Sequence, residues 1–391
     1  SAVELKSITK RFPGVLANDR IDFAVERGEI HSLLGENGAG KTVLMSILYG
    51  LYRPDEGRIF VKGEEVEIDS PAKAIRLGIG MVHQHFMLIP SFTVAENIIL
   101  GREFTKNGVL LDMDRILDYT KKFCEQYRLE VDLKAPVHAL PVGVQQRVEI
   151  LKALYRGADI LILDEPTSVL TPQEVEELFR AVRALKQREK TVIFISHKLK
   201  EVLEISDRIT VLRKGRVVGT VDAKEISPDE LAEMMVGRKV AFTFEKKNAE
   251  LGEVVLRVEG LGALDDRKLR ALRKVTFEVH ASEILGIAGV EGNGQSELVE
   301  VLTGLRKAAE GKIFLDGTDI TDISPNERIK LGISHVPEDR HKRGLILDFS
   351  LMENLILGCH NNPPFTKGRV RLDLEEVSNY AERLIEDYSI K

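Results

Sequence analysis

The stretch Gly35-Glu36-Asn37-Gly38-Ala39-Gly40-Lys41-Thr42 decides the fold of this 391-residue chain. It follows an apolar run of the β type, residues 30–34, and opens an apolar-periodic helical segment, residues 41–49. Glycines let consecutive backbone N–H groups turn inward around phosphate oxygens, and the helix adds the positive end of its dipole. The pattern G-x-x-x-x-G-K-[ST] between a strand and a helix therefore predicts a phosphate-binding loop.

The residues of this loop have separate expected tasks. Lys41 would reach the β- and γ-phosphates of a nucleotide, and the Thr42 hydroxyl would bind Mg²⁺. A glycine turn that opens an ordinary helix is the alternative, and the β-type run before the loop counts against it. The positions expected to contact the nucleotide are Gly35, Asn37, Gly38, Ala39, Gly40, Lys41, Thr42 and Val43.

Two further apolar runs, residues 160–163 and 191–195, have the continuous pattern of buried parallel strands. The first run delivers Asp164 and Glu165 at its carboxyl end, where open α/β sheets bind ligands. Asp164 would hold Mg²⁺ through water, and Glu165 would orient or deprotonate the attacking water. The second run leads to His197, which could contact the γ-phosphate; a packed surface residue is the alternative for a lone histidine there. A strand that ends in solvated acids is the alternative for the Asp-Glu pair taken alone.

Between these runs lies an amphipathic pattern, residues 172–188, which predicts a helix with Thr171 as its N-cap. Strand, helix and strand in succession predict an α/β sheet.

The chain repeats itself at an offset of 254 residues, from Phe23 to Phe277. The other paired positions include Glu29 and Glu283, Gly35 and Gly289, Gly40 and Gly294, Gly57 and Gly311, and Gly63 and Gly317. After a three-residue insertion, residues 96–101 match residues 353–358. Chance supplies a few glycine matches but not such a series, so the chain holds two copies of one domain.

The two copies differ in extent. The first is expected over residues 1–240, and a polar, charged stretch after position 227 is typical of a helix followed by a linker, residues 241–252. The second copy is expected over residues 253–391 and stops before the counterparts of everything after about Lys134. A domain that ended there would leave core strands unpaired.

Composition excludes several classes of protein. The 62 acidic and 56 basic side chains give a formal charge of -6, which argues against a protein built mainly to hold nucleic acid. No apolar run approaches the roughly 18 residues of a membrane span, and no signal-peptide layout is visible. Cys124 and Cys359 are too few for a disulfide framework, which predicts a reducing, cytosolic compartment. We expect no transition metal, because paired ligand spacing is missing among His31, His83, His85 and His138.

The order of these motifs resembles that of an ABC-type ATPase over essentially the whole chain. The matching segments are residues 35–42, Gln84, residues 140–147, residues 164–167 and Ser196-His197. The resemblance implies an α/β fold of the P-loop NTPase type, with a RecA-like core, an antiparallel β subdomain and a helical subdomain of about residues 94–140, duplicated in tandem. It also implies ATP and Mg²⁺ as cofactors.

The resemblance further implies roles for single residues. Gln84 occupies the position of the family's Q-loop glutamine, which binds Mg²⁺ and senses the membrane partner. Phe12 occupies the position of an aromatic residue that stacks on adenine. Gly143 is the main match in the signature segment, and residues 168–171 occupy the D-loop. The expected catalytic residues are Lys41, Gln84, Glu165 and His197, and the expected Mg²⁺ ligands are Thr42, Gln84 and Asp164.

Several residues depart from the family pattern. Val43 replaces a Thr or Ser near the α-phosphate, which is expected to cost about 1 kcal/mol of affinity. In the second copy, Gln295 replaces the P-loop lysine and Glu338 replaces the Q-loop glutamine. Each P-loop of a head-to-tail pair is closed by the other copy's signature, so the defects of both copies fall in one site. One competent and one degenerate ATP site are therefore expected. The substitutions in the first signature are Pro141, Val142 and Val144.

Two tandem copies, the second with an altered loop, resemble the fused ATPases of bacterial sugar and nucleoside importers. Residues 14–18, 82–88 and 170–174 look most like the nucleoside branch, which works with a substrate-binding lipoprotein; the ribose- and galactose-type branch is the alternative. The implied partners are multi-span permease subunits, a second ATPase domain bound head to tail (the C-terminal half or a second copy) and, indirectly, an extracytoplasmic substrate-binding protein, with no nucleic acid. The implied location is peripheral, on the cytoplasmic face of the inner membrane.

Two other functions compete with import. A soluble tandem ABC protein that acts on ribosomes is disfavoured by the net negative charge and by the missing second lysine. A small-molecule P-loop kinase would explain the loop but not the duplication or the signature-like segment. The signature that closes the Lys41 site would lie just past Lys391 by the repeat offset, so this 391-residue chain is expected to bind Mg-ATP and to hydrolyse it slowly.

Overall fold

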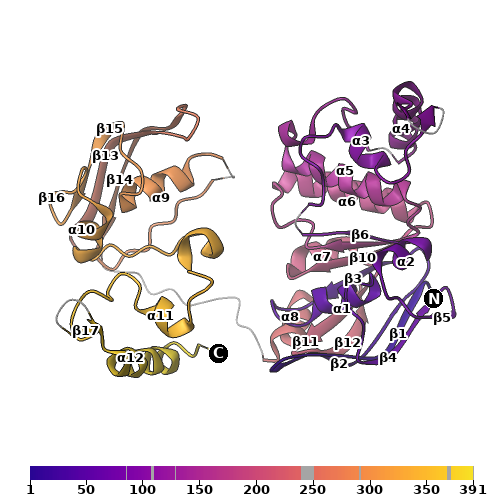
Figure 1. Ribbon diagram of the computed structural model, residues 1–391, viewed down its shortest axis with the longest axis horizontal. Helices are drawn as coiled ribbons and strands as arrows, with labels where there is room; N and C mark the ends of the chain where they lie inside the picture. The colour runs from indigo at the N-terminus through magenta and orange to yellow at the C-terminus, as the bar shows by residue number, and fades with distance from the viewer. Residues whose placement is uncertain are drawn as a thin grey trace. The chain divides into compact units, whose positions relative to one another are not determined.

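The computed structural model describes residues 1–84, 86–106, 110–127, 129–238, 251–289, 292–367 and 371–390, and of residues 341 and 342 the backbone alone. The chain divides into two compact units, Ser1–Phe244 and Glu245–Lys391 (Figure 1). Most of the expected linker, residues 241–250, and His85 in the predicted Q-loop region lie outside the described residues.

A six-stranded sheet forms the centre of the first unit, in the order β12-β11-β3-β10-β9-β6. All neighbouring strands are parallel except β11 and β12, which are antiparallel. The central strands are buried along their whole length, as the continuous apolar runs predicted. The α/β prediction is therefore confirmed. The strands are β3 (Ile30–Leu34), β6 (Ile79–Val82), β9 (Ile160–Asp164), β10 (Thr191–Ser196), β11 (Arg208–Arg213) and β12 (Arg216–Asp222).

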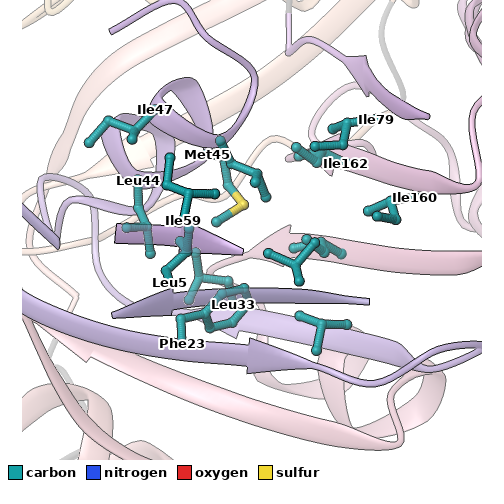
Figure 2. Packing of buried hydrophobic residues seen from close by; sticks show 14 of the residues in the cluster. Leu5, Phe23, Leu33, Leu44, Met45, Ile47, Ile59, Ile79, Ile160 and Ile162 are labelled. Carbon is teal, nitrogen blue, oxygen red and sulfur yellow. The ribbon is translucent and has the colours of Figure 1, made fainter. Parts of the chain in front are cut away.

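An antiparallel sheet of order β2-β1-β4-β5 faces the central sheet. Figure 2 shows the apolar core between them, in which Phe23 of the antiparallel sheet, Leu33 of β3 and Met45 of the intervening helix are packed in one buried cluster. This packing fixes the chain just before and just after the predicted phosphate loop. The strands are β1 (Val3–Phe12), β2 (Val15–Val25), β4 (Glu56–Val61) and β5 (Glu64–Val66).

Two helices of the first unit had predicted starting residues, Lys41 and Pro172, and both helices begin there. The helix after the loop ends one residue earlier than expected, at Leu48, and the helix expected over 172–188 ends at Lys186. Thr171 caps that helix by accepting a hydrogen bond from the backbone N–H of Glu174, which confirms its N-cap role. The helices are α1 (Lys41–Leu48), α2 (Pro71–Arg76), α3 (Val94–Ile99), α4 (Met113–Tyr127), α5 (Val142–Tyr155), α6 (Pro172–Lys186), α7 (Leu199–Ile205) and α8 (Pro228–Val236).

Residues 94–140, the expected helical subdomain, hold α3, α4 and the short 3₁₀ helix Val137–Ala139. A small hairpin of β7 (Thr105–Lys106) and β8 (Leu110–Leu111) joins α3 to α4. Figure 1 shows α3 and α4 and the antiparallel sheet at opposite ends of the first unit, with the central sheet between them. No helix in the described part of the chain combines the length and apolar character needed to cross a bilayer.

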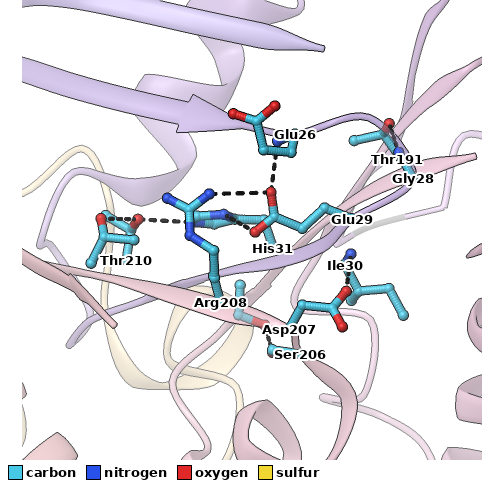
Figure 3. Close-up of polar contacts among 12 residues, drawn as sticks. Glu26, Gly28, Glu29, Ile30, His31, Thr191, Ser206, Asp207, Arg208 and Thr210 are labelled. Atoms are coloured by element: carbon cyan, nitrogen blue, oxygen red, sulfur yellow. Dashed lines mark hydrogen bonds and ion pairs between the residues drawn. The ribbon is translucent and has the colours of Figure 1, made fainter. Parts of the chain in front are cut away.

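A buried polar network anchors β3 at the end that is remote from the loop (Figure 3). His31 Nδ1 lies 3.0 Å from Glu29 Oε1, and its Nε2 lies 2.7 Å from Thr210 Oγ1 of β11. The Ile30 N–H donates to the Asp207 carboxylate at 2.9 Å. His31 therefore has a structural role in joining two strands.

The second unit repeats the antiparallel sheet, the loop helix and part of the helical segment. Its main sheet has the order β14-β13-β15-β16, which matches the order of β2-β1-β4-β5. The elements are β13 (Val254–Leu264), β14 (Arg270–His280), α9 (Gln295–Thr303), β15 (Glu310–Leu315), β16 (Thr318–Asp319), α10 (Pro325–Lys330), the π-helical turn Arg340–Gly344, α11 (Leu351–Leu355), β17 (Thr366–Lys367), β18 (Arg371–Leu372) and α12 (Leu374–Asp387).

The repeat extends to single hydrogen bonds. In the first unit, the Asn97 side chain accepts from the Ile89 N–H at 2.8 Å and donates to the Ile89 and Thr93 carbonyls, both at 3.1 Å. In the second unit, Asn354 makes the equivalent bonds to Ile346, at 2.9 and 3.0 Å, and to the Ser350 carbonyl at 3.1 Å. These matching sets confirm that the two halves are copies of one structure.

The second unit differs from the first in its centre. The stretches equivalent to β3 and β6, residues 284–288 and 333–336, form no strand in the described part of the unit. Ile284 is 97% exposed and Val336 is 92% exposed. In the first unit these strands pair with β9, β10 and β11, and the 391 residues hold no second copy of those partners. The RecA-like core expected in both copies is thus observed only in the first among the described residues.

Candidate active site

The loop between β3 and α1 has a shape that requires glycine at two positions. Gly40 has a φ of +97°, and a Cβ there would lie 2.3 Å from the Ala17 carbonyl oxygen. A Cβ on Gly35 would lie 2.4 Å from the Leu212 carbonyl oxygen. Buried Asn18 fixes the end of the loop, because its Nδ2 donates to the Gly40 carbonyl at 3.1 Å. The loop is therefore held in place by the neighbouring strands, as a phosphate cradle requires.

Lys41 lies over this loop at the start of α1. Its Nζ donates to the Gly35 carbonyl at 2.7 Å and to the Glu36 carbonyl at 3.0 Å. Burial lowers the pKa of Lys41, and the charges of Glu165 and Asp164 oppose that shift. The ammonium group is therefore close to both predicted carboxylates.

Asp164 ends β9 as a buried carboxylate with unmet bonding capacity. Its Oδ1 accepts no hydrogen bond from any described residue. Burial and the charge of Glu165 raise the pKa of Asp164 to about 6, against the opposing effects of the Thr42 hydroxyl and Lys41. A buried carboxylate with one oxygen left without a hydrogen bond, beside a hydroxyl, is an oxygen donor set that fits Mg²⁺. Mg²⁺ held by Thr42 and Asp164 would neutralise the negative charge that develops on the phosphate group.

Replacing Asp164 by Asn is expected to raise the free energy of unfolding of the nucleotide-free protein at pH 7 by about 1–3 kcal/mol. The pKa of Asp164 is raised from 3.8 to about 6 in the folded state. Between these two pKa values the folded state therefore binds more protons than the unfolded state. The free energy of unfolding falls as the pH rises through that range. Urea unfolding at pH 4 and pH 7 measures the effect, which should be smaller at pH 4. Mg-ATP affinity should fall in the same variant, and equal stability of both proteins at pH 7 would contradict the prediction.

Glu165 is the residue on which the other predicted catalytic groups converge. Gln84 Nε2 donates to Glu165 Oε2 at 3.2 Å, and His197 Nδ1 lies 3.1 Å from Glu165 Oε1. Its backbone has a φ of +45°, a left-handed conformation that costs a non-glycine residue about 1 kcal/mol or more. The structure thus brings three segments, which are far apart in sequence, to one carboxylate that could orient or deprotonate a water molecule.

Other predicted site residues lie apart from this cluster. Phe12 ends β1, and its ring packs edge-on against Tyr52 at a centroid distance of 5.4 Å. A Cβ on Gly143 would lie 2.5 Å from Glu174 Oε1, so the signature glycine contacts the capped start of α6. Their roles in adenine stacking and in closing a facing site stay predictions. Val43 packs against the core of the first unit, which gives a physical reason for an apolar residue there.

Sequence reasoning missed two sets of supporting residues. Asn18 served only as a marker of the nucleoside branch, although a buried asparagine beside a tight glycine turn is a signal of loop support. Polar residues of α5, spaced by three positions between apolar neighbours, also escaped notice. They are Gln146, Glu149 and Lys152, all buried.

A glycine cradle, a buried lysine at a helix start and a pair of carboxylates at a neighbouring strand end together define a P-loop nucleoside-triphosphate hydrolase. The ABC transporter family model matches residues 18–168 and 272–390. The chain therefore belongs to the ABC transporter family, and it is an ABC ATPase with two tandem family regions. The resemblance read from its motifs is confirmed.

Three relatives are similar to this chain over its whole length. The guanosine import ATP-binding protein NupO of Bacillus subtilis (strain 168) is 50% identical over 389 residues, or 100% of this chain and 76% of that protein. The nucleoside import ATP-binding protein NupA of Lactococcus lactis subsp. cremoris (strain MG1363) is 46% identical, and the match covers 100% of this chain and 77% of that protein. The glucose import ATP-binding protein TsgD13 of Haloferax volcanii is 47% identical, over 100% and 76%.

The fold is also that of solved ATP-binding cassettes. A nucleotide-free ATP-binding cassette from an ABC transporter superposes with a TM-score of 0.53 at 22% identity, and the match covers 60% of this chain and 95% of that one. The predicted P-loop NTPase fold of the ABC type is confirmed.

Proposed function

We propose that this chain is the ATP-hydrolysing subunit that couples hydrolysis to the import of nucleosides or related sugars by a bacterial ABC transporter. The observation that carries the proposal is the convergence of Gln84 and His197 on the Glu165 carboxylate, beside Lys41 and Asp164. The names of the relatives, which include guanosine and nucleoside import proteins, support the nucleoside branch.

The positions of the residues in the first site support a separate role for each. The loop amides and Lys41 would hold the phosphates, and Thr42 with Asp164 would hold Mg²⁺. Glu165 would take a proton from, or orient, the attacking water, while His197 contacts the γ-phosphate. Gln84 contacts Glu165 directly, so the Q-loop segment and the hydrolytic carboxylate would move together.

The second copy would form the degenerate member of the pair. Gly294 has a φ of +96°, close to the +97° of Gly40, so the residue before the helix has the same backbone conformation in both copies. Gln295 takes the place of the lysine, and its side chain lies so close to Gly289 that a Cβ there would be 2.1 Å from its Nε2. Ser296 donates to the Glu338 carboxylate at 3.3 Å, where the first copy has Gln84. An extra negative charge and a missing ammonium group both disfavour phosphate.

A hollow of about 250 Å³ in the first unit supports the proposed contact with the permease. Its apolar lining includes Tyr49, Leu51 and Met81, and His83 and Met87 lie on the Q-loop side. A short permease helix with an apolar face would fit this groove. The chain would then lie peripherally at the cytoplasmic face of the inner membrane, and the extracytoplasmic substrate-binding protein would act on it only through the permease.

Co-purification from detergent-solubilised membranes tests the class of function. We expect the chain to bring down a multi-span permease encoded beside it, because the groove would bind one of its helices. Sedimentation with ribosomes and without a permease would favour the soluble alternative instead. A photoactivatable crosslinker attached to the thiol of a Met87→Cys variant should join it to the permease, and a crosslink map that places the permease elsewhere would reject the groove.

Solute uptake by a strain that lacks the gene for this chain tests whether the chain belongs to the nucleoside branch or to the sugar branch. We expect the strain to lose uptake of labelled guanosine while it retains uptake of labelled ribose and galactose, and a plasmid copy should restore the loss. Loss of ribose or galactose uptake alone would assign the chain to the alternative sugar branch.

A further inference from the structure

Helix α5 carries a row of polar contacts at every third residue. Gln146 Nε2 donates to the Pro166 carbonyl at 2.6 Å. The Met87 N–H donates to Glu149 Oε1 at 2.6 Å, and Lys152 Nζ donates to the Met87 carbonyl at 2.6 Å. Residues three apart are neighbours on a helix surface, so these contacts form one continuous row along α5.

The polar side chains of this row are buried. Gln146, Glu149 and Lys152 are 1%, 5% and 7% exposed, in a helix that otherwise contributes apolar side chains to the core. Burial raises the pKa of Glu149 and lowers that of Lys152, so the surroundings disfavour both charges. Apolar residues would pack here at lower cost. What the polar residues provide instead is a fixed attachment of two other chain segments to α5.

The two attached segments are functionally distinct. Pro166 directly follows Glu165, so Gln146 joins α5 to the chain that carries the hydrolytic carboxylate. Met87 is held at both its N–H and its carbonyl, yet its side chain is 64% exposed at the rim of the 250 Å³ hollow. An exposed methionine held by a buried ion pair is a rigid, apolar contact point.

We propose that Gln146, Glu149 and Lys152 are positioning residues that make α5 a rigid connection between the Met87 rim and the Glu165 segment. The connection through α5 adds to a direct contact between the same two segments. In that contact Gln84, three residues before Met87 in the sequence, donates a hydrogen bond to Glu165. Nucleotide bound at Lys41 thereby changes the position of Met87, and a partner that displaces Met87 changes the position of Glu165. The meaning of this connection for a permease rests on the proposed function, whereas the connection itself belongs to the first unit alone.

Methyl NMR of the 391-residue chain tests the connection without a permease or a transported solute. The seven methionine methyl groups are labelled with ¹³C, and a Met87→Leu variant assigns the Met87 signal. Saturating Mg²⁺ and a non-hydrolysable ATP analogue should shift the Met87 signal in the unaltered chain. In Gln146→Leu, which cuts α5 from Pro166 and leaves Gln84 in place, the shift should fall about two- to tenfold.

Arg147→Gln is the matched control on the same helix. Arg147 lies outside the row and pairs with Glu177 of α6 at 2.9 Å, so this variant should keep the full Met87 shift. Lys152→Leu cuts the other end of the row, should also reduce the shift, and decides the question if Gln146→Leu does not fold.

Two results would overturn the proposal. One is an absent Met87 shift in the unaltered chain. The other is a full shift in Gln146→Leu or Lys152→Leu, even with a lowered melting temperature, because the row would then be structural only. A failed uptake assay would overturn the proposed function and leave this result untouched.

Discussion

In the assembled transporter, Lys41→Ala is expected to abolish solute uptake, whereas Gln295→Ala at the equivalent position of the second copy should change it little. Lys41 lies beside Asp164 and Glu165, so its loss removes the only loop ammonium near those carboxylates among the described residues. Removal of one preorganised donor costs about 10²- to 10³-fold in rate. Uptake and ATPase rates in proteoliposomes measure both variants.

Gln295→Ala serves as the control for truncation at the same loop position. Binding of a fluorescent ATP analogue to each variant separates lost binding from lost turnover. Equal damage from both substitutions would show that the scheme of one competent and one degenerate site is wrong.

Glu165→Gln is expected to leave ATP binding intact and to reduce hydrolysis by about 10²- to 10⁴-fold. Glutamine keeps the shape of the side chain and can still bond to Gln84 or His197, but it cannot accept a proton from water. Steady-state turnover of the assembled transporter and equilibrium nucleotide binding measure the two effects.

Glu189→Gln is a matched control, because Glu189 is also a glutamate with a left-handed backbone, at a φ of +59°. It lies exposed in the turn after α6, where it pairs with Arg27 at 3.7 Å. Its turnover should equal that of the unaltered chain. Unchanged turnover in Glu165→Gln would exclude the assigned role.

Local sequence signals predicted the strands and helices that surround the site of the first unit. Continuous apolar runs gave β9 and β10, and the Thr171 cap gave the start of α6, because these patterns reflect short-range packing and hydrogen bonding. The spacing of the glycines predicted the phosphate loop. The backbones of Ala17 and Leu212 lie so close to Gly40 and Gly35 that a side chain has no room there. Such signals need no knowledge of distant parts of the chain.

Tertiary contacts were beyond the same reasoning. No spacing rule states that Gln84 reaches Glu165, and the prediction that the two belong to one site came from family resemblance alone. The hydrogen bonds of the Met87 backbone to Glu149 and Lys152 also depend on how α5 lies against the Q-loop segment. Among the described residues, 284–288 and 333–336 form no strand because the 391 residues hold no copy of their partner strands, which a repeat alignment predicts and a local pattern does not.

The matching bond sets around Asn97 and Asn354 bear on how the chain assembles. Each set holds a nine-residue segment, 89–97 or 346–354, by bonds made entirely within that segment. In tandem repeats, tethered segments of one shape are at a high effective concentration, and exchange of one for the other is a general misfolding hazard. Vectorial synthesis limits this hazard, because the first copy completes its own contacts before the second leaves the ribosome.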